Sequence, residues 1–442
     1  MDRAEKVGGT HKALVLSNLY HSTPRIPALC KYLPAHGWEP TIITPRIDAS
    51  GKTHVALPTR DLGRLRIVQV GEETTYEERK GRSGAHGVVR ILNDAVDKIN
   101  PSPDSDIKAM VERNYWRAYT IKNFPDPERG WEAPLTEAAR KLLRDERFDA
   151  ILSSSSPVIT HIAAGKLREE FGLPWVADLR DLWSQNHNLP MGKVLRAMTS
   201  NLERTTLAKA SALVTVSPTW ADDLRSLHRR DKVYCITNGF DPEDVVEVKA
   251  RPGKFTITYT GQVYPGKQDP GLTIIAIMML LYEGNVRRDE FELRFYGPRN
   301  ETVDGLASEL GLGGIVNQYG PVTRMASLER QWESHLLLLM DWDDRTQPGV
   351  IPLKFFEYLH TRNPMLVTGG NKAGVVAQMV RDTGCGKNTR TVDETAEAIG
   401  AFLAKFREGS WSREIACDTA KSSKFAFPSL AGDYAVVLDS VL

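Results

Sequence analysis

Lys354 and Glu357 stand three residues apart in the segment GVIPLKFFEYLHTRNP, which covers Gly349–Pro364. An aspartate-rich loop leads into this segment, and apolar runs flank it at His335–Met340 and Met365–Thr368. This order predicts a strand, a loop, a helix and a second strand. Residues three apart on a helix share one face, so we expect the ammonium and the carboxylate to lie together.

The beginning of the predicted helix is suited to an anion. Pro352 fits the first helical turn, where its missing N–H costs nothing. The residues before it, Val350 and Ile351, leave backbone N–H groups that point out of the helix start, and Lys354 adds a positive charge. Glu357 lies one turn deeper, where its carboxylate can accept two hydroxyls of a sugar. A nucleoside diphosphate needs this arrangement, with phosphate at the mouth and ribose just inside.

The simpler interpretation of the same segment is an amphipathic helix with a surface Lys–Glu pair. Phe355, Phe356 and Leu359 recur at a spacing that lets all three face a sheet, whatever the helix binds. The nucleotide interpretation gains support from other segments of the chain that fit the same ligand.

A glycine-containing loop, TGQVYPGKQDP at Thr260–Pro270, is one of these segments. It follows a predicted strand, and its backbone amides, with Gly261 and Gln262 among them, can hold a pyrophosphate together with Lys267. The loop lacks the GxxxxGK[ST] pattern, so it is not a P-loop, and no GxGxxG dinucleotide fingerprint is present in the chain.

Charged residues follow a buried strand in the first half of the chain. The predicted strand Trp175–Leu179 contains Asp178, and Arg180, Asp181 and Trp183 come directly after it. Charges beside a buried strand cost free energy unless they are paired or solvated in a cleft, so these residues are functional candidates. A structural Arg–Asp pair that fixes the loop is the alternative, above all for Asp178.

Composition narrows the class of protein. A chain of 442 residues is too long for one core, so we expect two domains. Lys and Arg total 57 against 56 for Asp and Glu, and this balance argues against bulk nucleic-acid binding. No apolar run approaches the roughly 20 residues of a membrane span, and the polar N-terminus lacks a signal-peptide core.

The cysteine pattern points to a reducing compartment. The four cysteines are scattered, and their spacing predicts neither a zinc motif nor a disulfide framework. We therefore expect a cytoplasmic protein, either in solution or at the inner face of the membrane.

Strands and helices alternate in both halves, which predicts an α/β fold with two domains. The domains are expected at 1–245 and 246–424, and residues 425–442 form a last helix. The loop after the first strand contains Asn18 and Arg25 and lies at the carboxyl edge of its sheet, where such sheets bind ligands. The segment Arg113–Phe124 mixes aromatic and basic residues, so it either touches a membrane or lipid-linked acceptor or, more simply, covers the first domain.

Five stretches together resemble the retaining, nucleotide-sugar-dependent glycosyltransferases of the GT-B fold, family 4 type. They occur in the family's order and span nearly the whole chain: Arg25–Pro40; Gly172–Trp183; Ala212–Ser217 with Asn238–Asp241; Tyr259–Gly261 with Gly266–Pro270; and Gly349–Pro352 with Lys354–Leu359.

The resemblance implies two Rossmann-like domains that face each other across a cleft, with the last helix crossing back onto the first domain. The second domain would bind a UDP- or GDP-sugar and the first an acceptor, which is a glycan, a lipid-linked molecule or a small molecule. Donor binding is implied for Asn18, Gly261, Gln262, Lys267, Val322, Val350, Ile351, Pro352, Lys354 and Glu357. Arg180, Asp181 and Lys267 would be catalytic, and Arg25, Asp178 and Trp183 would lie on the acceptor side.

The implied reaction transfers a sugar to a hydroxyl in cell-surface polysaccharide or glycoconjugate synthesis, without metal or cofactor. The chain departs from the family pattern at two places: Gln262 stands where relatives often have arginine, and Pro348 and Gly349 stand where many have an additional glutamate. Two alternatives stay open, a nucleotide-sugar 2-epimerase on the same fold and a non-enzymatic nucleotide-sugar-binding or scaffold protein. The sequence Asp341–Asp344 suggests a manganese motif, but a solvated loop is the better interpretation.

Overall fold

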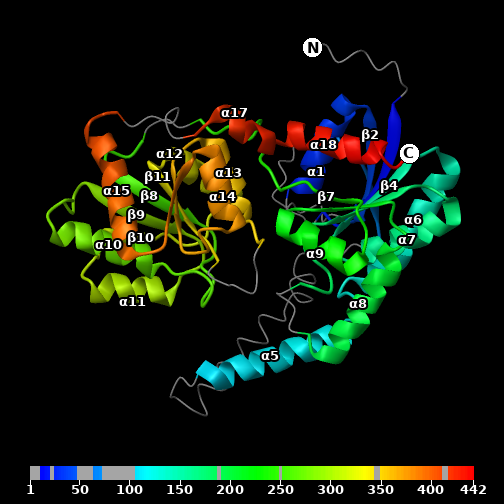
Figure 1. Cartoon of the computed structure of the whole chain (residues 1–442), viewed down its shortest axis with the longest axis horizontal. Coiled ribbons are helices and arrows are strands. Elements are labelled where there is room, and N and C mark those ends of the chain that lie inside the picture. The colour runs from blue at the N-terminus through cyan, green and yellow to red at the C-terminus, as the bar shows by residue number, and fades with distance from the viewer. Residues whose placement is uncertain are drawn as a thin grey trace. The chain divides into compact units, whose positions relative to one another are not determined.

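The computed structural model describes residues 10–19, 24–46, 63–71, 105–186, 191–247, 251–342, 349–410 and 417–442. The chain divides into two compact units, whose elements are labelled in Figure 1. The first unit consists of Met1–Val216, Trp220–Ile236 and Ala431–Leu442, and the second of Ser217–Thr219 and Thr237–Leu430. The domain limits expected from the sequence stay a prediction.

The first unit contains a parallel sheet of seven described strands in the order β3-β2-β1-β4-β5-β6-β7. The strands are β1 His11–Ser17, β2 Trp38–Pro45, β3 Arg66–Val70, β4 Ala150–Ser155, β5 Trp175–Leu179, β6 Ala212–Thr215 and β7 Val233–Cys235. The helices are α1 Arg25–Tyr32, η1 Leu33–His36, α5 Ser105–Lys122, η2 Arg129–Trp131, α6 Glu132–Asp145, α7 Ile159–Phe171, α8 Lys193–Leu207 and α9 Pro218–His228.

The second unit repeats this architecture with a parallel sheet of six described strands in the order β10-β9-β8-β11-β12-β13. The strands are β8 Phe255–Thr260, β9 Phe291–Tyr296, β10 Val316–Gln318, β11 Leu336–Met340, β12 Met365–Thr368 and β13 Gly386–Thr389. The helices are α10 Gly271–Tyr282, α11 Glu301–Glu309, α12 Arg324–Glu333, α13 Leu353–Thr361, α14 Val375–Thr383, α15 Val392–Arg407, α17 Thr419–Ser422 and η3 Ser423–Phe425.

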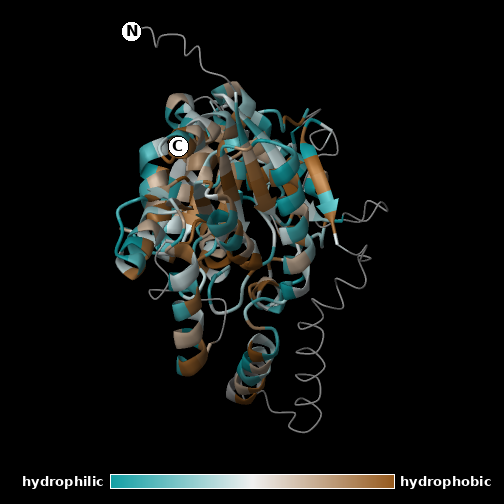
Figure 2. Ribbon diagram, turned by 90° about the vertical axis from the view of Figure 1, so that its right-hand side faces the viewer, coloured by the Kyte–Doolittle hydropathy of each residue, from teal (hydrophilic) through white to brown (hydrophobic). Residues whose placement is uncertain are grey.

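Both sheets are covered on their two faces, so their central strands are buried along most of their length. All five residues of β11, LLLLM, are buried, and β5 is buried along its whole length. Figure 2 shows brown, hydrophobic strands inside the molecule and helices that carry teal, hydrophilic residues around them. The α/β class and the two Rossmann-like domains expected from the sequence are confirmed.

Helix α13 packs on its sheet as its periodicity predicts. Phe355, Phe356 and Leu359 are buried in one cluster with Leu337 and Leu339 of β11. Lys354 and Glu357 are left on the partly exposed face of the helix. Burial of the aromatic face therefore fixes the direction in which the two charged side chains project.

The C-terminal helix α18, Phe427–Asp439, returns to the first unit. The guanidinium carbon of Arg25 lies 5.7 Å from the centre of the Tyr434 ring. Trp38 Nε1 donates a hydrogen bond of 2.9 Å to Asp439 Oδ1. The expected return of the last helix to the first domain is confirmed.

Some sequence predictions need correction. Cys385 and Cys417 form a disulfide, so the expectation that no cysteines are paired was wrong. Strand β13 was not predicted, because its sequence GKNT has no apolar residue.

The aromatic and basic stretch of Arg113–Phe124 lies mostly in α5. Within the described residues, no helix combines the length and the apolar composition needed to span a bilayer.

Candidate functional site

The loops after β8, β9 and β10 meet at the carboxyl edge of the second sheet. Gly261 N donates to Tyr296 O at 2.7 Å, and Gly297 N donates to Gly320 O at 3.0 Å. A Cβ atom at Gly297 would lie 2.2 Å from the Gly261 carbonyl oxygen, so only glycine allows these two loops to approach. The carboxyl edge of a parallel sheet is where open α/β folds bind ligands.

Lys354 reaches from the start of α13 to this edge. Its Nζ donates a 2.6 Å hydrogen bond to the Tyr259 hydroxyl and lies 3.8 Å from the centre of that ring. Gly261 has φ +111°, and a Cβ added there would lie 3.1 Å from the same ammonium. The ammonium therefore lies against the glycine turn after β8.

Burial lowers the pKa of Lys354 to about 7, although the negative charge of Glu357 opposes the shift. The amine is therefore about half protonated near neutral pH. Burial also raises the pKa of Tyr259, so its hydroxyl keeps its proton and donates to the Gln262 carbonyl oxygen at 2.7 Å. A nearby anion would raise the pKa of Lys354 and complete its protonation.

Glu357 is held at the centre of a polar network and is 19% exposed. Its Oε1 accepts from Arg324 Nη1 at 2.6 Å, and its Oε2 accepts from Gln331 Nε2 at 3.2 Å. Gln331 Nε2 also donates to Thr260 Oγ1 at 3.0 Å, and Arg324 Nη2 donates to Asp244 Oδ2 at 3.2 Å. The carboxylate thus has a fixed orientation and keeps lone pairs for further donors.

The N-terminus of α13 has no side-chain cap, and its first turn carries no acidic residue. Pro352 is the N-cap rather than a residue of the first turn, with φ −60° and ψ 135°. The Ile351 side chain is buried in the α13 core cluster, and Val350 is partly exposed. The first amides of a helix have no partner within the helix, so this end is electropositive.

Lys267 and Val322 lie on the other loops of this edge. Lys267 Nζ is 4.1 Å from the centre of the Trp342 ring, and Trp342 follows β11. Val322 is 39% exposed in the loop after β10. Just before that loop, the rings of Tyr296 and Tyr319 are stacked with their centres 4.9 Å apart. The second unit therefore brings the candidate donor residues of its loops to one edge of its sheet.

Two candidates of the first unit, Arg25 and Asp178, form a buried ion pair. Arg25 Nη2 lies 2.9 Å from Asp178 Oδ1, and neither side chain is exposed. Ser154 Oγ also donates to Asp178 Oδ2 at 2.8 Å. Burial alone would raise the pKa of Asp178, but the Arg25 charge and these hydrogen bonds lower it overall. This geometry fits the structural alternative for Asp178 and does not offer its carboxylate to solvent.

Arg180, Asp181 and Trp183 follow β5, as expected. Arg180 Nε lies 3.6 Å from Asp181 Oδ2, and the Asp181 side chain is 45% exposed. Trp183 is buried, and its Nε1 has no hydrogen-bond partner among the described residues. Asn18 is buried at the end of β1, where the following residue, Leu19, donates its backbone N–H to Thr44 Oγ1 at 3.1 Å.

The acidic loop after β11 is described only at Asp341 and Trp342, and Asp343 and Asp344 lie outside the described residues. Asp341 is buried, and its Oδ1 accepts from Trp342 N at 2.9 Å. Across the ranges that the structure describes, no three His, Cys, Asp or Glu side chains come together as a metal site.

Arg324, Gln331 and Asp244 belong to the site, but sequence reasoning did not identify them. Arg324 is separated from Glu357 by 33 positions, and Asp244 lies beside the boundary expected between the two domains at residue 245. The only signal in the sequence is Thr323 before Arg324, which predicts a helix start and in fact caps α12 by accepting from Ala326 N. Nothing in that signal indicates which carboxylate the arginine meets.

Comparisons with known proteins agree with this architecture. Residues 26–244 match the model of Glycosyltransferase Family 4. None of the curated proteins matches the chain in sequence.

Several solved structures share the fold at low sequence identity. Sucrose-phosphate synthase from Thermosynechococcus elongatus is 12% identical, with 97% of this chain and 98% of that chain covered and a TM-score of 0.58. HepE from Anabaena, solved with UDP and glucose, is 14% identical, with 97% and 100% covered and a TM-score of 0.59. The N-terminal domain of trehalose-6-phosphate phosphatase from Candida albicans is 13% identical, with 99% and 98% covered and a TM-score of 0.61.

Proposed function

Because the chain is a GT-B-fold glycosyltransferase of family 4 type, we propose that it transfers a sugar, with retention of configuration, from a UDP- or GDP-sugar to an acceptor hydroxyl. The observation that carries the proposal is the position of the Lys354 ammonium, against Gly261 and at the uncapped start of α13. A pyrophosphate at this position would meet backbone amides, a helix dipole and a cation together. HepE from Anabaena, which has also been solved with UDP-glucose, is a protein of this fold that binds such a molecule.

The rest of the donor would extend from the pyrophosphate along the face of α13. Glu357 lies one turn from Lys354, and its orientation by Arg324 and Gln331 suits it to accept two ribose hydroxyls. The base would lie toward Val322, which is exposed in the loop after β10. Lys267 would supply a second cation for the phosphates.

The proposed reaction depends on stabilisation of the negative charge on the leaving diphosphate and does not use a protein nucleophile. The bond between the anomeric carbon and the phosphate oxygen breaks, and the acceptor oxygen bonds to that carbon from the same face. The acceptor hydroxyl proton passes to the departing phosphate oxygen. Lys354, Lys267 and the helix start would stabilise the negative charge that grows on the leaving diphosphate.

The acceptor side would be formed by the loops after β1 and β5. Arg180 and Asp181 follow a buried strand, and Asp181 is exposed enough to contact a solute. We propose an acceptor in cell-surface polysaccharide or glycoconjugate synthesis: a glycan, a lipid-linked molecule or a small molecule.

A thermal-shift screen against UDP, GDP and their sugars tests the donor assignment, because a ligand of the native state raises the unfolding midpoint. We expect one diphosphate to stabilise the protein, and its sugars to do so as well. Incubation of the stabilising donor with glycan and lipid-linked acceptors, followed by NMR of the anomeric proton, then tests transfer and retention. The donor assignment is wrong if no nucleotide diphosphate or nucleotide sugar changes the midpoint, and retention is wrong if the product has the opposite anomeric configuration.

A further inference from the structure

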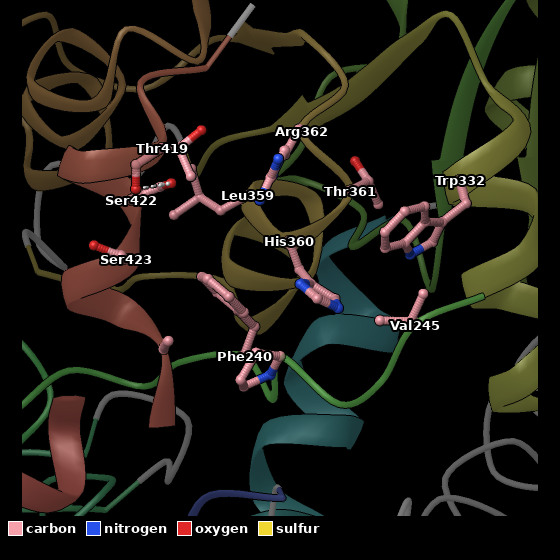
Figure 3. A pocket seen from close by; sticks show the side chains of 12 residues that line it. Phe240, Val245, Trp332, Leu359, His360, Thr361, Arg362, Thr419, Ser422 and Ser423 are labelled. Carbon is pink, nitrogen blue, oxygen red and sulfur yellow. Dashed lines mark hydrogen bonds between the residues drawn. The ribbon is translucent and has the colours of Figure 1, made fainter. Parts of the chain in front are cut away.

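A cavity of about 400 Å³ lies at the end of α13 that is remote from Lys354 (Figure 3). All of its lining residues belong to the second unit. Its walls come from the segment around Phe240, from Trp332 of α12, from the C-terminal end of α13 and from the segment around Ser422. Lys354 lies at the opposite end of the same helix, and none of the proposed donor residues lines the cavity, so this is a separate site.

Backbone hydrogen bonds join two walls of the cavity, so its shape does not depend on a ligand. Phe240 N donates to Phe425 O at 3.1 Å, and Phe427 N donates to Phe240 O at 2.9 Å. These bonds form a parallel bridge between Phe240 and Ala426, which ties two walls together. A preformed cavity of this size, with mostly apolar walls and a few polar groups, is typical of small-molecule sites.

One part of the wall is aromatic and neutral. The rings of Phe240 and His360 are stacked with their centres 4.9 Å apart, and Trp332 meets His360 edge-on at 5.3 Å. His360 Nε2 donates to the Asp244 carbonyl oxygen at 3.1 Å. Burial lowers the pKa of His360, so the ring carries no charge near neutral pH. This wall suits a flat apolar body.

Arg362 supplies the charge of the cavity. None of the twelve described residues that line the cavity is acidic, and Arg362 forms no ion pair among the residues described. It ends α13 with φ +59°, a left-handed conformation that glycine adopts without cost and that a side chain disfavours. Glycine would adopt this backbone conformation with less strain than arginine. The presence of arginine at a strained position suggests that its exposed guanidinium has a function.

Two serine hydroxyls across the cavity already donate hydrogen bonds to the backbone. Ser422 Oγ donates to Thr419 O at 3.3 Å, and Ser423 Oγ donates to Ala420 O at 2.9 Å. In Figure 3 these side chains lie on the side opposite Trp332, with Arg362 between the two. Because both serine protons are already used, Arg362 is the stronger partner for a negative group.

We propose that this cavity is a second ligand site, which binds a small aromatic carboxylate. Its ring would lie against the wall of Phe240, His360 and Trp332, and its carboxylate would bind the Arg362 guanidinium through two parallel hydrogen bonds. The site does not depend on the donor assignment, because no proposed donor residue lines the cavity and binding of the carboxylate is first measured without nucleotide, sugar or acceptor.

Titration of the full chain with 2-naphthoate by calorimetry tests this site. We expect saturable one-to-one binding and a loss of about tenfold to a hundredfold in affinity in Arg362→Gly, since hydrogen bonds to charged groups carry that much. Arg362→Gly is a matched variant because glycine favours the backbone conformation at this position, so its thermal midpoint should not fall. Arg362→Lys keeps the charge but not the paired hydrogen bonds, and it should bind with intermediate affinity.

Two further titrations distinguish this site from nonspecific binding of an apolar ring and from binding at the donor site. The uncharged 2-naphthylmethanol should bind the unmodified protein more weakly than 2-naphthoate, and saturating UDP should leave 2-naphthoate affinity unchanged. The proposal is overturned if 2-naphthoate does not bind, if Arg362→Gly binds it as tightly as the unmodified protein, if the alcohol binds equally well, or if UDP displaces it.

Discussion

The Arg324 guanidinium lies 2.6 Å from the Glu357 carboxylate and uses its other arm for Asp244 at 3.2 Å. Burial alone would lower the pKa of Arg324, but the two carboxylates raise it overall, so it stays charged. The arginine thus joins α12 to α13 and turns Glu357 toward the candidate donor site. Arg324 therefore orients the Glu357 carboxylate without having to contact the nucleotide itself.

Removal of the Glu357 side chain should weaken donor binding without unfolding the protein. Glu357→Ala deletes the acceptor proposed for two ribose hydroxyls, and each charged hydrogen bond contributes about 1.5–3 kcal/mol. We expect UDP or GDP affinity to fall by about tenfold to a hundredfold or more in calorimetric titration. Arg324 keeps Asp244 as a partner in this variant, so the fold should persist.

The matched control for this prediction is Glu329→Ala, which removes an exposed carboxylate from α12. It should bind the diphosphate with unchanged affinity and unfold at the same midpoint. If Glu357→Ala binds as tightly as this control, the carboxylate is only the partner of Arg324, and its assignment to ribose is wrong.

The sequence predicted those parts of the site that depend on local periodicity. Lys354 and Glu357 share a face of α13 because Phe355 and Phe356 must be buried on the other face. Pairings across long separations were not predictable in this way. No pattern along the chain indicated that Arg324 meets Glu357, because α12 and α13 become neighbours only through their packing on one sheet.

Two features of the fold were missed because the sequence carries no local signal for them. Cys385 and Cys417 are 32 positions apart, with nothing in their spacing to pair them. Strand β13 consists of GKNT and joins the sheet through backbone bonds to β12, without the apolar alternation that identifies a strand. The role of Asp178 could not be decided from the sequence, because an aspartate at the end of a buried strand can form a structural ion pair or belong to an exposed site.

Breaking the buried pair of Arg25 and Asp178 should destabilise the first unit. Asp178→Asn leaves the Arg25 charge buried without its counter-charge, which costs about 3–5 kcal/mol. Urea unfolding should therefore shift to lower denaturant, whereas Asp181→Asn, at a side chain that is 45% exposed, should change little. The double variant Arg25→Met, Asp178→Leu should recover most of the stability, because it removes both charges together.

The ion pair of Arg25 and Asp178 also predicts that acid lowers the stability of the folded protein. The pKa of Asp178 is lower in the folded protein than its ordinary value, so its contribution is complete above the unfolded pKa of about 3.9. That stability is lost as pH falls below this value toward the folded pKa. The double variant should lose less stability than the unmodified protein between pH 5 and the acid transition, and equal losses would show that another carboxylate is responsible.

Sugar transfer should survive the removal of divalent metal. The proposed leaving-group stabilisation rests on Lys354, Lys267 and the helix start, and therefore needs no ion. We expect the transfer rate in excess EDTA to stay within about twofold of the untreated rate, because the charge on the diphosphate is already met. Activity that disappears in EDTA and returns with manganese would instead implicate the acidic loop that begins at Asp341.

Donor binding should take up a proton through Lys354. The pKa of this amine is about 7 in the free protein, so at pH 8 it is mostly neutral, and a diphosphate placed beside it would favour the charged form. Affinity should be greatest below pH 7 and should fall by up to tenfold per unit as pH rises above 7, until the raised pKa of the complex is reached.

Calorimetry at pH 8 in Tris and in phosphate measures this proton directly, because the observed enthalpy differs by the ionisation enthalpy of the buffer multiplied by the protons taken up. We expect an uptake between about one half and one proton for UDP or GDP in the unmodified protein, given a free pKa near 7. Lys354→Met should bind more weakly with no uptake, and Lys267→Met should bind more weakly with the uptake retained. Uptake that persists in Lys354→Met would place the titrating group elsewhere, and the proposed contact between this ammonium and the pyrophosphate would be wrong.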